Sequence, residues 1–153
     1  MVVAFCGHSD YIANKKDERK ILDILEQEVG SKDCEFFLGE YGNFDSFCYF
    51  CASQYKKTHP QCKLVHVTPY YSVEHQENHL QHQKQRFDYI LYPELENTPP
   101  RYAIVHRNKW IIEKADILIS FITRKYGGAY NAYLHAKKRN RRIFNIADFS
   151  VDL

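Results

Sequence analysis

Short, continuous apolar runs alternate along this chain with segments in which apolar residues recur at the spacing of an α-helix. Runs without in-and-out alternation are typical of strands that are buried on both faces of a parallel sheet covered by helices. Because parallel strands are joined by right-handed crossovers, this order of elements favours a doubly wound arrangement. The sequence therefore predicts an α/β fold, a Rossmann-like three-layer sandwich around a mostly parallel sheet of roughly six strands. The predicted strands are residues 2–6, 36–38, 64–67, 89–92, 117–122 and 143–146.

Length and composition limit the classes of protein to which this chain can belong. Its 153 residues, 44% hydrophobic and 26% charged, predict one globular domain that spans residues 1–153. No apolar run reaches the roughly 18 residues of a membrane helix, and the N-terminus lacks the basic segment of a signal peptide. Five cysteines in no disulfide framework indicate a reducing compartment. We therefore expect a cytoplasmic protein that makes no contact with a membrane.

The charge of the chain is nearly balanced. A net charge of +2 is far below the basic excess of a dedicated nucleic-acid binder. One basic run, residues 137–142, lies at the end of the last predicted helix, where cations complement the helix dipole. We therefore do not expect nucleic acid to be a partner, and the sequence leaves self-association into a homo-oligomer open.

Glycines follow three of the predicted strands, and ligands of open parallel sheets bind at that edge. A helix N-terminus with free N–H groups and no obstructing side chain binds phosphate well. A sharp turn also uses glycine for steric reasons alone, so one such turn decides little. Three turns on one sheet edge favour a nucleotide or phosphate site over the purely structural interpretation. The glycines are Gly7, Gly39, Gly42, Gly127 and Gly128.

Polar residues beside these glycines each have a functional and a structural interpretation. His8 directly follows Gly7 and is placed either to donate to an anion or to cap the chain locally. Glu40 is suited to a ribose hydroxyl, and its structural alternative is a solvated loop acid. Asp45 is placed to meet a ligand or to cap a helix, and for Asp10 the helix cap is the preferred interpretation.

The order of the motifs resembles that of the SLOG superfamily. This group includes the LOG phosphoribohydrolases, the DNA-processing protein DprA and molybdenum-cofactor carrier proteins. The similarity is closest to its small bacterial members, which have a glycine-histidine first loop and a glycine-glycine-alanine last loop. It implies a Rossmann-like domain that binds nucleotides or nucleotide-derived signals at the glycine loops. The resemblance rests on residues 5–8, 38–45, 107–110, 115–118 and 127–129.

The resemblance to LOG enzymes is incomplete at the residues that carry catalysis. Those enzymes have a Pro-Gly-Gly-x-Gly-Thr-x-x-Glu motif that supplies a catalytic glutamate. Aligned from Gly127, this chain has Asn131 in place of the threonine and Leu134 in place of the glutamate. Arg107 matches the arginine that LOG enzymes carry on the preceding helix. Cleavage of an N-glycosidic bond usually needs a carboxylate, so the match implies an anion-binding site that lacks its catalytic acid.

The function that we predict is binding or sensing of a nucleotide or a nucleotide-derived small molecule. The alternative is a nucleotide N-glycosidase or phosphoribohydrolase-type enzyme, for which Glu40 would be the catalytic residue. A third interpretation is a structural or regulatory interaction protein whose pocket is vestigial. The predicted ligand-binding residues are Gly7, His8, Gly39, Glu40, Gly42, Asp45, Arg107, Gly127, Gly128 and Asn131.

Two groups of residues raise the question of a metal site. Cys48 and Cys51 form a Cys-x-x-Cys pattern, followed by ligand types at positions 59, 62 and 66. Because Cys51 shares an apolar helix face with aromatic residues, buried thiols explain the pair better than zinc. The second group, His75, His79 and His82, lies in a polar, glutamine-rich stretch that is more typical of an exposed helix or lid. We predict neither a metal nor a cofactor, and the role of residues 75–82 is left open.

Overall fold

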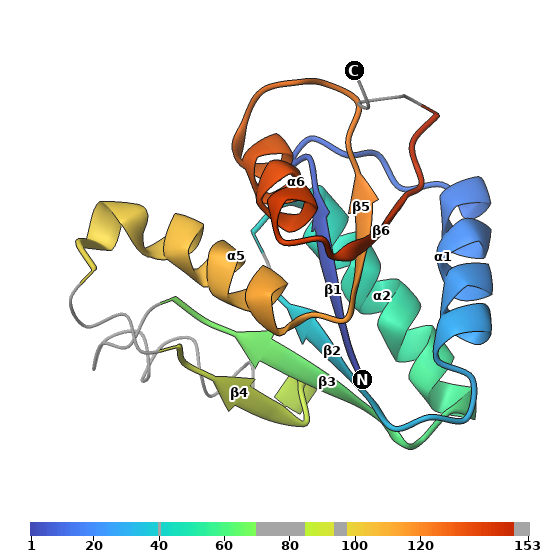
Figure 1. The fold of residues 1–153 in the computed structure, drawn as a ribbon. Helices are drawn as coiled ribbons and strands as arrows, with labels where there is room; N and C mark the ends of the chain where they lie inside the picture. Colours follow the sequence, from blue (N-terminus) through green and yellow to red (C-terminus); the bar gives the residue numbers. More distant parts are fainter. Residues whose placement is uncertain (40, 70–84, 94–97, 149–153) are drawn as a thin grey trace.

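The sheet confirms the predicted Rossmann-like sandwich and is parallel throughout (Figure 1). A computed structural model of the chain describes residues 1–39, 41–69, 85–93 and 98–148. Six strands lie in the order β4-β3-β2-β1-β5-β6, and each predicted strand is found with its ends moved by no more than two residues. The strands are β1 (Val2–Gly7), β2 (Cys34–Leu38), β3 (Cys62–Val67), β4 (Tyr89–Leu91), β5 (Ile117–Phe121) and β6 (Arg142–Asn145).

Helices cover both faces of the sheet, as Figure 1 shows. On one face lie α1 (Lys15–Glu28) and α2 (Asn43–Thr58). On the other face lie α5 (Ala103–Lys114), which a short 3₁₀ turn at Pro100–Tyr102 precedes, and α6 (Gly128–Lys138). None of the helices in the described part of the chain is long and apolar enough to cross a membrane.

Burial on both faces explains why the strands are continuous apolar runs. Phe36 and Phe37 are neighbours on β2 and therefore point to opposite sides of the sheet. Phe36 packs in the core beneath α1 and α2, together with Val3. Phe37 packs on the other side, where its ring stacks on Trp110 of α5 with centroids 5.8 Å apart. A polar residue at either position would lack a hydrogen-bond partner, which is costly in a core.

The cysteines lie where the buried-thiol interpretation expects them. Cys34, Cys48, Cys51 and Cys62 are buried among the apolar residues beneath α1 and α2. Burial raises the pKa of Cys48 well above its ordinary value, so this thiol stays protonated. Among the described residues, no three His, Cys, Asp or Glu side chains are grouped to hold a metal ion. The predicted histidine face at residues 75–82 lies outside the described residues.

The position of β1 in the sheet determines where loops can form a pocket. From β1 the chain continues to β2, β3 and β4 on one side, and α5 then returns it to β5 on the other side of β1. The strand order therefore reverses between β1 and β5, which pair in register from Val3–Ile117 to Gly7–Phe121. At such a switch point the loops leave in opposite directions and a crevice opens beyond the carboxyl ends.

Candidate functional site

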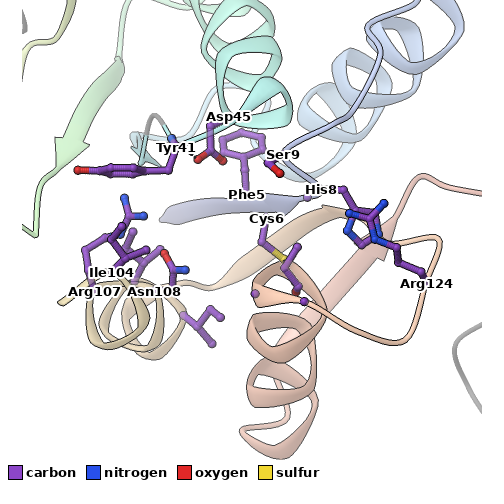
Figure 2. Close-up of a pocket in the computed structure, with 16 residues that line it drawn as sticks. Phe5, Cys6, His8, Ser9, Tyr41, Asp45, Ile104, Arg107, Asn108 and Arg124 are labelled. Carbon is purple, nitrogen blue, oxygen red and sulfur yellow. Dashed lines mark hydrogen bonds between the residues drawn. The ribbon is translucent and has the colours of Figure 1, made fainter. Parts of the chain in front are cut away.

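A pocket of about 280 Å³ lies at this switch point (Figure 2). Four segments line it: residues 5–9 at the end of β1, Tyr41 and Asp45 around the start of α2, one side of α5 between Ile104 and Ile112, and Arg124 with residues 127–129 at the start of α6. These segments are far apart in the sequence, and the parallel sheet brings them to one edge. The volume is slightly below the roughly 300–1,000 Å³ that is typical of small-molecule sites.

A larger hollow of about 670 Å³ lies between the start of α1 and α2. Its lining is mostly apolar and includes Tyr11, Phe47 and Phe50, with no glycine turn and no arginine among the described residues. The pocket at the switch point is therefore the better candidate, because polar groups from several loops converge there.

Of the three predicted glycine turns, the one at the start of α6 has free space beside its glycines, Gly127 and Gly128. Gly127 has a φ of +94°, a conformation that favours glycine, and Gly128 begins the helix. A Cβ built on either residue would meet nothing within 4 Å. The first intrahelical bond runs from the Asn131 N–H to the Gly127 carbonyl at 3.0 Å, so the N–H groups of the first turn have no acceptor within the helix. This turn has the geometry that an anion requires.

The other two glycine turns are shaped by protein packing. A Cβ on Gly7 would overlap the ring of Phe44, which is fully buried. A Cβ on Gly39 would overlap the guanidinium of Arg107, and one on Gly42 would lie 2.8 Å from the Ser9 Cα. Gly7 lines the pocket, whereas Gly39 and Gly42 lie outside its lining.

Arg107 of α5 is a buried arginine. Its exposed fraction is 2%, and its Nη1 donates to the carbonyl of Val67 at 3.2 Å. The ring of Tyr41 covers the guanidinium at 4.7 Å from the ring centroid. Arg107 lines the pocket, yet its contacts also fasten α5 to the end of β3.

Asp45 lies at the pocket, in the first turn of α2. Its Oδ2 accepts the backbone N–H of Tyr41 at 2.7 Å, which ties the chain before the helix to its first turn. The N-cap of α2 is Gly42 and has no side-chain capping bond, so the helix cap predicted for Asp45 is not found. The thiol of Cys6 also lines the pocket, and burial, followed by the charge of Asp45, raises its pKa far above the ordinary value. A thiol held in the protonated form is a poor nucleophile. Glu40 lies outside the described residues.

His8 is buried at the end of β1 and bridges to the loop after β5. The backbone N–H of Thr123 donates to its Nε2 at 2.9 Å, so this nitrogen carries no proton and the neutral ring is protonated at Nδ1. Burial, and then the charge of Arg124, lowers the pKa of His8 below its ordinary value of 6.5. His8 is therefore a neutral hydrogen-bond acceptor that positions the loop before Gly127.

Arg124 lines the pocket and is a charged residue that the sequence patterns did not single out. Its Nη1 donates to both carboxylate oxygens of Asp10, at 3.2 and 3.0 Å. This corrects the capping role expected of Asp10, because Asn14 caps α1 by accepting the N–H of Asp17 at 2.8 Å. Arg124 follows a predicted strand and precedes the glycine pair, so the sheet-edge argument that selected the glycines also applies to it.

The two positions compared with the LOG motif on α6 lie away from the pocket. Asn131 is exposed and does not line the pocket, because it lies three residues into the helix and about 4.5 Å along its axis from the edge. Leu134 is partly buried and packs against Ile122 and Tyr133.

These features define an α/β protein of the Rossmann-like class, with a pocket at the switch point of a parallel sheet. The solved structures that share this fold include DNA processing protein A (DprA) from Streptococcus pneumoniae, with a TM-score of 0.65 and 18% identity. DprA from Helicobacter pylori matches with a TM-score of 0.61 and 16% identity, and the structural genomics target TM1055 with 0.55 and 14%. Comparison with protein-family models and with curated proteins finds no match.

The similarity confirms, for the fold, the predicted resemblance to a group that includes DprA. It covers 98%, 95% and 93% of this chain in the three comparisons. This chain spans 51% of the Streptococcus pneumoniae DprA chain, 64% of the Helicobacter pylori one and 71% of TM1055. The Helicobacter pylori structure describes a mode of single-stranded DNA binding, which is a property of that protein.

We expect Gly7→Ala to destabilise the protein, because its methyl group would occupy the space of the buried Phe44 ring. Overpacking of this kind costs about 1–3 kcal/mol, measured as the free energy of unfolding in urea. Gly128→Ala is the matched control and should stay within about 0.5 kcal/mol, since its Cβ meets no atom. Adding Phe44→Leu to Gly7→Ala should restore part of the loss. A fully stable Gly7→Ala protein would contradict this packing.

We expect stability to decrease as the pH falls below 6.5, in part through His8. Its pKa is lower in the folded than in the unfolded chain, so unfolding takes up a proton between the two values. The contribution of His8 to the free energy of unfolding is therefore complete above its pKa in the unfolded chain. It is lost as the pH falls toward its pKa in the folded protein. Urea unfolding at several pH values should show a shallower decrease in His8→Gln, which keeps a neutral acceptor for Thr123. Equal slopes in the two proteins would contradict a neutral, buried His8.

Proposed function

We propose that this protein binds a nucleotide or a nucleotide-derived small molecule in the pocket at the switch point. The observation that carries this proposal is the open start of α6, where Gly127 and Gly128 present first-turn N–H groups with no side chain in front of them. The partial positive charge of a helix N-terminus adds to these donors and favours a phosphate. The ligand-binding residues in this proposal are Gly7, His8, Asp45, Arg107, Gly127 and Gly128, all of which line the pocket.

The rest of the pocket suits the other parts of a nucleotide. Two arginines line it, Arg107 on α5 and Arg124 in the loop before α6, and both favour anionic ligands. The ring of Tyr41 lines the pocket beside Arg107 and is partly exposed, and an aromatic ring in a pocket suits a flat base. We place this activity in a single domain, residues 1–153, that works in the cytoplasm.

Among the described residues, the pocket has few carboxylates that could act in catalysis, which favours binding over hydrolysis. Asp45 is the one carboxylate among the described residues that line it, and the Tyr41 N–H already occupies one of its oxygens. This hydrogen bond fixes Asp45 against the start of α2. A phosphoribohydrolase would therefore depend on Glu40, whose position lies outside the described residues.

Single-stranded DNA is the alternative ligand that the DprA similarity introduces. The basic run gives it little support at this pocket, because the run lies at the carboxyl end of α6, whereas the pocket lies at the amino end of the same helix. We therefore propose a small nucleotide, and a short oligothymidine serves as a competitor in its test.

The test of this proposal is Gly128→Asp, measured by calorimetry with AMP, GMP, CMP and UMP. A carboxylate at the first position of α6 should lower the affinity about tenfold or more, equivalent to about 1.4 kcal/mol. The same charge is favourable for the helix itself, so the variant should unfold no more easily than the parent protein. Gly128→Asn, of equal size and no charge, should lose less affinity. Unchanged binding by folded Gly128→Asp, or binding of oligothymidine alone, would contradict the proposal.

We expect no release of free base when the protein is incubated with these nucleoside monophosphates. The residue at the position of the LOG glutamate, Leu134, is packed in an apolar cluster and supplies no acid. Binding without a group that acts more strongly on the transition state produces no turnover. Chromatography after prolonged incubation at micromolar protein measures this. Release of base that disappears in Glu40→Gln would establish the glycosidase instead.

A further inference from the structure

The guanidinium of Arg124 stands at the rim of the pocket and pairs with a carboxylate that is easy to displace. Its partner Asp10 has an exposed side-chain fraction of 68%, and that of Arg124 is 32%. Exposed ion pairs contribute little to stability, because water and salt screen both charges. In Figure 2, Arg124 lies beside His8 and on the opposite side of the pocket from Arg107.

The pairing with Asp10 uses only part of the donor capacity of Arg124. Both carboxylate oxygens accept from the single nitrogen Nη1, at 3.2 and 3.0 Å, instead of from two nitrogens side by side. The Nε–H is buried and has no partner among the described residues. A guanidinium binds phosphate best through two parallel N–H bonds, which this geometry leaves unformed.

The loop that carries Arg124 is held in place independently of Asp10. The N–H of the preceding residue, Thr123, donates to the buried His8 ring at 2.9 Å. The ring of Tyr126 lies against the guanidinium, 5.1 Å from its centroid. Displacement of Asp10 would therefore leave Arg124 in the lining of the pocket that it shares with Gly127 and Gly128.

Arg107 differs from Arg124 in each of these respects. It is 2% exposed, it donates to the Val67 carbonyl, and the ring of Tyr41 covers it. A change of partner at Arg107 would disturb the attachment of α5 to the end of β3, whereas a change at Arg124 needs only the rotation of one exposed aspartate.

We propose that Arg124 is the arginine that binds the phosphate of the ligand at the start of α6, and that Asp10 competes with this phosphate for the guanidinium. The proposal rests on the nucleotide-binding function above and names the residue that sets its affinity. It assigns opposite roles to the two members of one ion pair. Arg124 strengthens binding, and Asp10 weakens it.

The experiment is a double-mutant cycle measured by calorimetry with AMP, GMP, CMP and UMP. Arg124→Gln should lower the affinity about tenfold, and Arg124→Lys, which keeps the charge without the paired donors, should lose less. Asp10→Asn should raise the affinity about threefold in the parent protein and have roughly no effect when combined with Arg124→Gln. Asp148→Asn is the matched control: Asp148 is an exposed, ion-paired aspartate outside the pocket lining, and this variant should bind as the parent does.

Several outcomes would overturn the proposal. If Arg124→Gln and Asp10→Asn both lower the affinity, the ion pair only holds the two loops together. If Asp10→Asn raises the affinity equally in the parent protein and in Arg124→Gln, the carboxylate acts through long-range charge and does not compete for Arg124. Unchanged binding by Arg124→Gln, with binding still lost in Gly128→Asp, would refute the role of Arg124 and leave the proposed function intact. If the parent protein binds none of the nucleotides, both proposals are wrong.

Discussion

The parallel pairing of β1 with β5 is the interaction on which the pocket depends. These strands are neighbours in the sheet although more than a hundred residues separate them, and their register runs the full length of β5. The pairing places the loop after β1 against the loop after β5, and it buries the apolar side chains of both strands on two faces. Because every strand is parallel, all the strand-to-helix turns meet at one edge, which is where a ligand can reach several of them together.

The three glycine turns look alike in the sequence but satisfy different physical requirements. Gly7 and Gly39 leave room for Phe44 and Arg107, two large side chains of this protein itself. Gly127 and Gly128 leave room that no protein atom fills. Only the last turn therefore has the open amides that an anion needs, and the first contributes mainly through the residues that follow it.

The loop after β1 lines the pocket and also holds the loop before α6 in position. His8 accepts the N–H of Thr123, and two residues later Asp10 pairs with Arg124. One short segment thus holds both the backbone and the side chain of the loop before α6. A neutral His8 is required for the first of these contacts, so its burial and lowered pKa belong to the architecture of the pocket.

The sequence by itself determined the α/β class, the strands, the edge at which the pocket lies, and the burial of Cys48 and Cys51. These follow from local rules, since apolar runs, helical spacing and glycine turns are properties of neighbouring residues. Only the tertiary structure decided that Asp10 pairs with Arg124, that His8 accepts from Thr123 and that Arg107 is buried beneath Tyr41. Residues 114 and 115 positions apart make the first two contacts, and no local pattern encodes which of many exposed charges will meet when the sheet assembles.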